Sequence, residues 1–197
     1  EYAAVRDDVS SSEQDVFTAV MRLAGMLIEE NRVIDAIAEY TRLSAVLTRE
    51  ELKCSVLLER GRAYYKLDKL QLAIEDFAKV SESNASTAEE ARFFLVLCYY
   101  RLGEDERARE LAQAYVSLYP ESTRIPDVVL WLAKSDFNRG DYAAAKEGFL
   151  DFTTRWPTDG RVANALYLAA RAAYQNQDYA AAVELIGRLA RIIDRKS

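Results

Sequence analysis

The first candidates for acid–base chemistry in this chain of 197 residues are carboxylates, because the sequence contains no histidine. Without histidine, no Ser-His or Cys-His nucleophile and no histidine-ligated metal site can be assembled. Adjacent carboxylates occur at Asp7-Asp8, Glu29-Glu30, Glu50-Glu51 and Glu89-Glu90. Neighbouring helical residues point about 100° apart, so these pairs are predicted to be solvated charges at helix ends. We therefore expect that the chain is not an enzyme.

The other reactive groups are sparse. The glycines are isolated single residues, so no glycine-rich loop is available to hold a phosphate. Cys54 is expected to begin one helix and Cys98 to lie near the end of an equivalent helix. Their axial offset would be roughly 14 Å, too long for a disulfide. We interpret both as small packing residues and expect no cofactor and no metal.

Composition excludes several partner classes. Half of the residues are hydrophobic and 29% are charged, which is typical of an ordered globular chain. The net charge of −6 and the pI of about 4.9 disfavour nucleic acid, which is bound through Lys and Arg. The longest apolar run, 93–100, is far shorter than the roughly 20 residues of a transmembrane helix. Because Glu1 replaces an initiating methionine, we expect a mature or truncated form, whose leader could lie upstream.

An alanine recurs at a nearly fixed interval along the chain. The steps between consecutive members are 37, 35, 37 and 37 residues; the alanines are Ala36, Ala73, Ala108, Ala145 and Ala182. Such a period is typical of a helical solenoid, whose units bury their apolar faces against their neighbours. In the fourth unit, two segments of helical periodicity flank the turn 138–141, where Gly140 is a natural helix-ending residue. Each unit is therefore predicted to be an antiparallel helical hairpin.

The pattern resembles the tetratricopeptide repeat. Counted from residue 54, the second unit places Leu57 at position 4, Gly61 at 8, Tyr64 at 11, Ala73 at 20 and Phe77 at 24, as that repeat does. The resemblance implies an all-α fold, a right-handed α-solenoid of about five helical hairpins in a single domain over 17–197. The implied units are 17–50, 54–87, 89–122, 126–159 and 163–196. Residues 1–16 are left as an N-terminal extension or the remnant of a preceding repeat.

A finer similarity concerns the later units. Tyr119-Pro120 and Trp156-Pro157 close their repeats 37 residues apart, and Asp-Tyr-Ala-Ala-Ala recurs at 141–145 and 178–182. These motifs are similar to repeats of bacterial envelope proteins, namely the outer-membrane assembly lipoprotein and the periplasmic cell-division coordinator. The similarity implies a periplasmic or outer-membrane-associated protein, with a cytoplasmic one as the alternative.

The resemblance also implies a partner-binding groove. In this family, positions 2, 5, 9, 12 and 13 of the first helix line the concave face, where aromatic and basic side chains would bind a peptide or partner protein. The candidate groove residues are Leu58, Arg62, Tyr65, Lys66, Phe93, Tyr100, Arg101, Leu130, Lys134, Phe137, Tyr167, Arg171 and Tyr174. Binding through the edges or the convex face is the alternative. A clamp for a chaperone's terminal carboxylate is disfavoured, because no unit pairs Lys at position 5 with Asn at position 9.

Other readings of the same pattern stay open. The chain could be a structural segment of a larger repeat protein, or an accessory domain of an enzyme whose catalytic part is elsewhere. The last helix carries Leu185, Leu189, Ile192 and Ile193 without a following unit to cover them. Solenoids need polar end caps, so we expect self-association or stacking of further repeats there, and a native protein that continues past residue 197.

Overall fold

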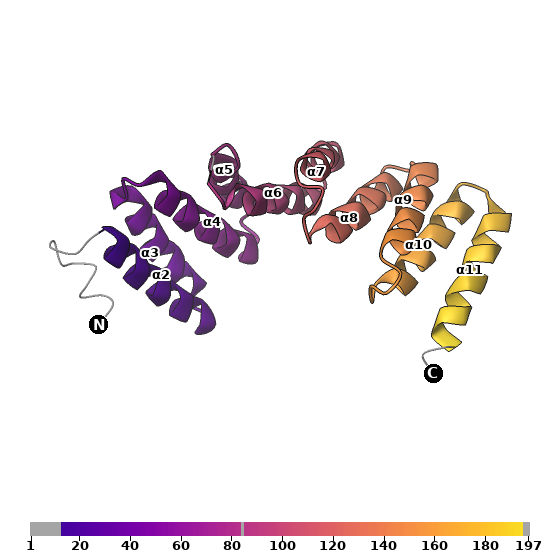
Figure 1. Ribbon diagram of the computed structural model, residues 1–197, viewed down its shortest axis with the longest axis horizontal. Helices are drawn as coiled ribbons and strands as arrows, with labels where there is room; N and C mark the ends of the chain where they lie inside the picture. Colours follow the sequence, from indigo (N-terminus) through magenta and orange to yellow (C-terminus); the bar gives the residue numbers. More distant parts are fainter. Residues whose placement is uncertain (1–12, 84, 195–197) are drawn as a thin grey trace. The chain divides into compact units, whose positions relative to one another are not determined.

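The chain folds entirely into helices where its structure is described. The computed structural model describes residues 13–83 and 85–194, and over these ranges it contains ten helices and no strand (Figure 1). The helices are α2 (Glu13–Glu29), α3 (Val33–Val46), α4 (Glu50–Lys66), α5 (Leu70–Ser81), α6 (Ala88–Leu102), α7 (Asp105–Leu118), α8 (Ile125–Asn138), α9 (Tyr142–Arg155), α10 (Val162–Gln175) and α11 (Tyr179–Asp194). The prediction of an all-α repeat fold is confirmed.

Four pairs of consecutive helices pack as hairpins within the units, namely α2–α3, α4–α5, α8–α9 and α10–α11, as the alanine period predicted. The first helices begin earlier than the predicted units: α4 begins at Glu50 rather than 54, and α2 begins at Glu13, inside the predicted extension. Residues 1–12 lie outside the described residues, so the prediction for them stays untested.

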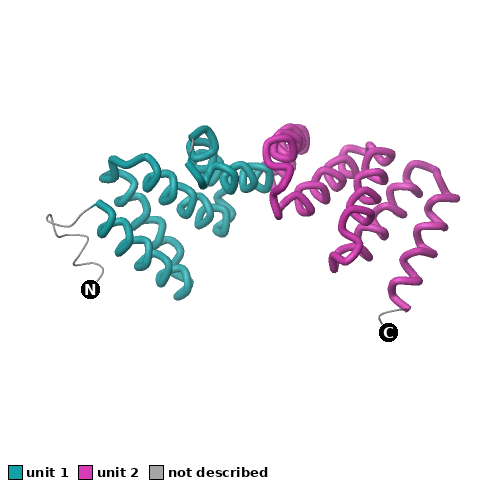
Figure 2. Tube along the Cα trace, in the orientation of Figure 1, with its two compact units in different colours: residues 1–98 teal, residues 99–197 magenta. Residues whose placement is uncertain are grey.

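The chain divides into two compact units, residues 1–98 and 99–197 (Figure 2). Unit 1 contains α2 to α5 and most of α6. Unit 2 contains the last residues of α6 and the helices α7 to α11. The single domain expected over 17–197 stays a prediction, and each unit is described by itself below.

The turn inside each hairpin has one residue in the left-handed backbone region. These residues are Asn31 (φ 62°), Asp68 (58°), Gly103 (73°), Gly140 (83°) and Gln177 (60°). They are separated by the same 37, 35, 37 and 37 residues as the alanines. Glycine adopts this region without a steric penalty, whereas other residues do not. The turn geometry is therefore set by the repeat, and three of its five copies use a residue other than glycine.

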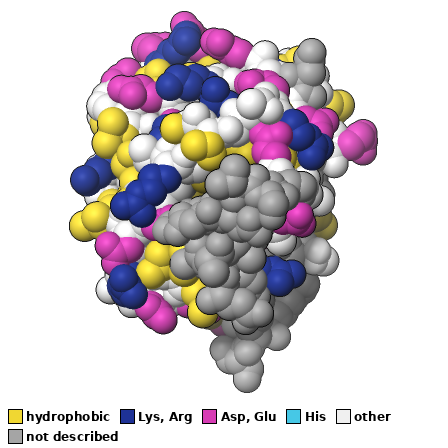
Figure 3. All heavy atoms as spheres, turned by 90° about the vertical axis from the view of Figure 1, so that its left-hand side faces the viewer, with side chains coloured by type: hydrophobic (Ala, Val, Ile, Leu, Met, Phe, Trp, Pro, Cys, Tyr) yellow, Lys and Arg dark blue, Asp and Glu magenta, His cyan; other side chains and the backbone are white. Residues whose placement is uncertain are grey.

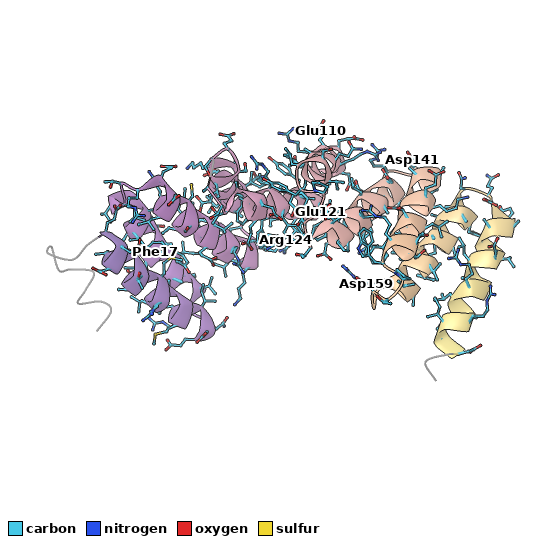
Figure 4. All side chains as sticks on the ribbon, viewed as in Figure 1. Phe17, Glu110, Glu121, Arg124, Asp141 and Asp159 are labelled. Carbon is cyan, nitrogen blue, oxygen red and sulfur yellow. The ribbon has the colours of Figure 1, made fainter. Side chains whose placement is uncertain are left out.

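Two of the second helices begin with the same aspartate cap. The Asp141 carboxylate (labelled in Figure 4) accepts a hydrogen bond of 3.2 Å from the Ala144 amide at the start of α9. Asp178 accepts the equivalent bond from Ala181, also at 3.2 Å, at the start of α11. Each cap satisfies an amide that has no partner within its helix.

Small residues let the paired helices approach closely. The five repeating alanines are at most 9% exposed. A Cβ atom built on Gly61 would lie 2.6 Å from the ring of Phe77, which is fully buried, so the contact leaves no space for a methyl group. Cys54 and Cys98 are both buried and free, as predicted for packing residues.

Partly buried ion pairs link helices within each unit. In unit 1, Arg60 of α4 forms two hydrogen bonds of 2.6 and 2.7 Å to Asp76 of α5, whose side chain is only 3% exposed. Asp76 therefore holds the pKa of Arg60 above its usual range. In unit 2, Arg109 of α7 pairs with Asp136 of α8. Asp136 occupies position 11 of the fourth unit, where the family has tyrosine. The ion pair with Arg109 explains why an aspartate can replace the tyrosine at this buried position.

A third arginine ties the loop before α10 to α8. Arg161 pairs with Asp159 at 2.8 Å and with Asp127 of α8, and its guanidinium lies 5.4 Å from the ring centre of Phe152. Asp159 (labelled in Figure 4) accepts hydrogen bonds from the Arg161 side chain and backbone, which lower its pKa to about 2. This linkage fixes the loop from which α10 starts.

Candidate partner-binding face

The adjacent carboxylates differ in exposure, and Glu89-Glu90 in the first turn of α6 are partly buried rather than fully solvated. Glu29-Glu30 and Glu50-Glu51 are exposed at helix ends, as the sequence predicted, and Asp7-Asp8 lie outside the described residues. Nowhere in 13–83 or 85–194 do three or more Cys, Asp or Glu side chains gather as a metal site would require. No helix in those ranges is long and apolar enough to cross a membrane.

Three of the candidate groove residues are buried instead. Leu58, Phe93 and Leu130, all at position 5 of their first helices, are 3, 7 and 6% exposed. Their side chains pack into the unit, and their part in a partner-binding groove stays a prediction. The physical reason is that a large apolar side chain at this position gains more by packing into the unit than by facing water.

In unit 1, the basic candidate Arg62 already has carboxylate partners. Its guanidinium lies 2.9 Å from Glu59 and 3.8 Å from Glu90, and 5.7 Å from the ring centre of Phe94. Tyr65 packs edge-on against the same Phe94 ring at 5.7 Å. The Arg62 charge is therefore largely compensated within the unit.

The remaining candidates of α4 and α6 differ in their exposure. Lys66 and Arg101 are exposed. Tyr100 is partly buried, and this burial, with a smaller effect of Asp105, raises its pKa. Lys66 is the last residue of α4, and Tyr100 and Arg101 lie in the last turn of α6.

Unit 2 brings the other candidates together. The Arg171 guanidinium of α10 lies 5.2 Å from the ring centre of Phe137 on α8 and 5.8 Å from that of Tyr167, one turn earlier on α10. Tyr167 is 46% and Tyr174 61% exposed, and Lys134 of α8 is partly exposed. We call Lys134, Phe137, Tyr167, Arg171 and Tyr174 the aromatic–basic face.

The charge of the aromatic–basic face is not compensated within the described part of the chain. No carboxylate of residues 13–83 or 85–194 lies within ion-pair distance of Arg171 or Lys134. The two rings fix the guanidinium plane through cation–π contacts while leaving its N–H donors available. The face can therefore accept a carboxylate without first breaking an internal ion pair.

Two tyrosines next to this face were missed from the sequence. Tyr142 lies 5.2 Å from Phe137, and Tyr179 lies 5.4 Å from Tyr174, both edge-on and both starting the second helix of their hairpin. They share position 17 of the repeat in Asp-Tyr-Ala-Ala-Ala, and this repetition was the signal that could have identified them.

The face drawn in Figure 3 carries charges of both signs. On the face shown in Figure 3, basic and acidic side chains alternate among scattered hydrophobic ones, without a continuous basic area. Nucleic-acid binding uses such an area, and the prediction drawn from the net charge stays a prediction.

Comparisons with known proteins decide the family. A profile of the tetratricopeptide repeat matches residues 58–123 and 131–196, together more than half of the chain. The chain belongs to the tetratricopeptide repeat family. No curated protein sequence matches it.

Several solved tetratricopeptide-like structures have the same fold. A MamA protein superposes with a TM-score of 0.79 at 18% identity, covering 93% of this chain and 94% of that one. The repeats of a putative kinesin light chain from Podosopora anserina give a TM-score of 0.74 at 18% identity, covering 95% and 100%. A tetratricopeptide repeat protein from Parabacteroides merdae gives 0.71 at 18% identity, covering 96% and 69%. At these identities the likeness establishes the fold alone.

Proposed function

We propose that this chain is a protein-interaction scaffold without catalytic activity of its own, and that its aromatic–basic face binds an acidic segment of a partner protein. Membership of the tetratricopeptide repeat family supports the scaffold role. The lack of histidine removes the commonest general base and metal ligand from the chain.

The observation that carries the binding proposal is the environment of Arg171. Its guanidinium is held by Phe137 and Tyr167 and has no carboxylate partner among the described residues, whereas Arg62 at the same repeat position has two. A guanidinium fixed by aromatic rings loses less conformational entropy when it binds a carboxylate in a bidentate manner. Lys134, one repeat earlier at the same position, would add a second cationic contact.

The aromatic rings define the rest of the ligand. Tyr167 and Tyr174 expose about half of their surface, so an apolar side chain of the ligand could cover them while a hydroxyl stays hydrated. The expected ligand is thus a short segment with at least one Asp or Glu beside an apolar residue.

The experiment is a selection from a random peptide library displayed on phage, using the 197-residue chain as the target. We expect enrichment of peptides containing Asp or Glu next to an apolar residue. Binding of a selected peptide, measured by fluorescence polarisation, should fall roughly 100-fold in the Lys134→Glu, Arg171→Glu double variant, because two attractive contacts become repulsive.

The control is Arg62→Glu, which removes a compensated charge in unit 1 and should leave the affinity nearly unchanged. Enriched peptides without an excess of acidic residues would contradict the proposal. Equal affinity for the wild type and the double variant would contradict it as well.

A bacterial envelope location remains part of this proposal only. It is supported by the Tyr119-Pro120 and Trp156-Pro157 repeat ends, and the comparisons add no support for it. Fractionation of the native cells should find the protein with the periplasm or outer membrane, and recovery in the cytoplasm would contradict this location.

A further inference from the structure

The last hairpin exposes a large apolar surface. Eleven large apolar side chains are exposed in the part of the chain that the structure describes, and six of them belong to α10 and α11. These six are Tyr167, Tyr174, Tyr179, Val183, Ile186 and Ile193. An apolar concentration of this kind marks an interaction surface rather than ordinary solvent exposure.

This surface continues an interface that the fold already uses. Position 24 of the second helix is buried in the first four repeats, at Tyr40 (2% exposed), Phe77 (0%), Ala112 (1%) and Phe149 (0%). The equivalent residue in α11, Ile186, is 48% exposed. The fifth hairpin therefore presents the same apolar position that the earlier hairpins cover.

The open surface has the form of a helix-sized groove. A groove of about 420 Å³ runs between α10 and α11, and its walls include Arg171 and Tyr174 of the aromatic–basic face together with Ala182, Val183 and Ile186 of α11. One repeat earlier, α10 packs on α9 and reaches α8 through Arg171 and Phe137. In unit 2, α10 and α11 run in opposite directions (Figure 1), so the natural occupant is a helix antiparallel to α11.

The exposed side of α11 itself is suited to that role. Tyr179, Val183, Ile186, Ala190 and Ile193 follow each other at steps of 4, 3, 4 and 3 residues, and all are exposed. This is the heptad spacing of a helix that packs lengthwise against another helix. The same helix therefore has both a groove beside it and a stripe that could fill such a groove.

Residues beside the stripe favour an antiparallel partner. Ala180 and Gly187 are exposed, and a Cβ atom on Gly187 would meet no other atom within 4 Å, so a second helix can approach closely. Beyond them stand Glu184 and Arg191, seven residues apart on one side of α11. In an antiparallel pair, Glu184 of each helix would lie near Arg191 of the other, whereas a parallel pair would place like charges together.

We propose that two copies of this chain associate through α11, each α11 lying antiparallel to the other in the groove between the partner's α10 and α11. The interface is symmetric, so every contact occurs twice. The sequence had placed self-association on Leu185, Leu189, Ile192 and Ile193. Of these four, Leu185 is only 3% exposed, whereas Ile193 is 54% exposed and belongs to the stripe described above.

Sedimentation equilibrium of the 197-residue chain tests the proposal. We expect a mass twice the 22.3 kDa of one chain, with dissociation on dilution. Val183→Glu should weaken the dimer by roughly 100-fold or more, because it places an unpaired charge in the interface. Val46→Glu is the matched control, since Val46 is also a valine of a second helix, is 66% exposed, and should not affect association.

Reversed charges test the orientation. Glu184→Arg and Arg191→Glu should each weaken the dimer roughly tenfold, and the combined variant should restore it, because the attraction is then re-formed with exchanged partners. A chain that stays monomeric at all concentrations overturns the proposal, even if another protein's helix binds the groove. A dimer insensitive to Val183→Glu, or a double variant that is not restored, also overturns it. None of these variants changes Lys134 or Arg171, but Arg171 and Tyr174 also line the groove. Peptide affinity is therefore measured at a concentration where the chain is monomeric, which keeps the two outcomes separate.

Discussion

At the scale of single residues, the clearest contrast is between arginines that stabilise the fold and one that is available to a partner. Arg60 is bound to Asp76 by two short hydrogen bonds, and Arg109 is paired with Asp136. Arg171 instead lies against two aromatic rings. The residue type alone does not distinguish these roles. What distinguishes them is whether the adjacent helix supplies a carboxylate.

The Arg60–Asp76 pair should contribute strongly to stability. Replacing Asp76 by Asn would leave the Arg60 charge in a site that is only 15% exposed, and we expect a loss of about 3 kcal/mol in the free energy of unfolding. Urea unfolding followed by circular dichroism measures this loss.

Asp151→Asn provides the control for that measurement. Asp151 pairs with Arg155 at 3.2 Å, but both side chains are about half exposed, so the loss should stay below about 0.5 kcal/mol. Equal losses in the two variants would contradict the structural role of the buried pair.

At the scale of helices, the sequence predicted the hairpins well because their determinants are local and repeated. The alanine period identified the four helix pairs that pack within the units, and the turn residue follows the same period. The faces of the helices were predicted less well. Both α4 and α11 carry apolar residues on several sides, so the sequence does not say which of them face the next helix. Leu58 and Leu185 were therefore assigned to exposed surfaces although packing buries them.

The left-handed turn residue offers a test at this scale. Gln177 has a φ of 60°, which costs a residue with a Cβ atom roughly 1–2 kcal/mol. Gln177→Gly should therefore raise the free energy of unfolding by about 0.5–1 kcal/mol, after the entropy cost of glycine is subtracted. Thermal unfolding should show this as an increase of a few degrees in Tm.

The same substitution two residues earlier should have the opposite sign. Gln175 lies at the end of α10 and is exposed, so Gln175→Gly loses helix propensity without relieving any backbone strain. A decrease in Tm for both variants would show that the left-handed backbone conformation does not favour glycine at residue 177.

At the scale of the whole molecule, the two compact units differ in what they offer a partner. Unit 1 compensates its basic groove candidate Arg62 with Glu59 and Glu90. Unit 2 contains the aromatic–basic face and the exposed side of α11. The sequence predicted the members of the aromatic–basic face from the family's groove positions, but it could not predict that unit 2 alone assembles them. That difference depends on carboxylates supplied by other helices.

Hydrogen exchange of the full chain with and without a selected acidic peptide tests this central claim most directly. Binding at the aromatic–basic face should slow the exchange of amides in α8 and α10, around Lys134 and Arg171, and leave α3 and α5 unchanged. Protection confined to α3 and α5, or no protection at a saturating peptide concentration, would contradict it.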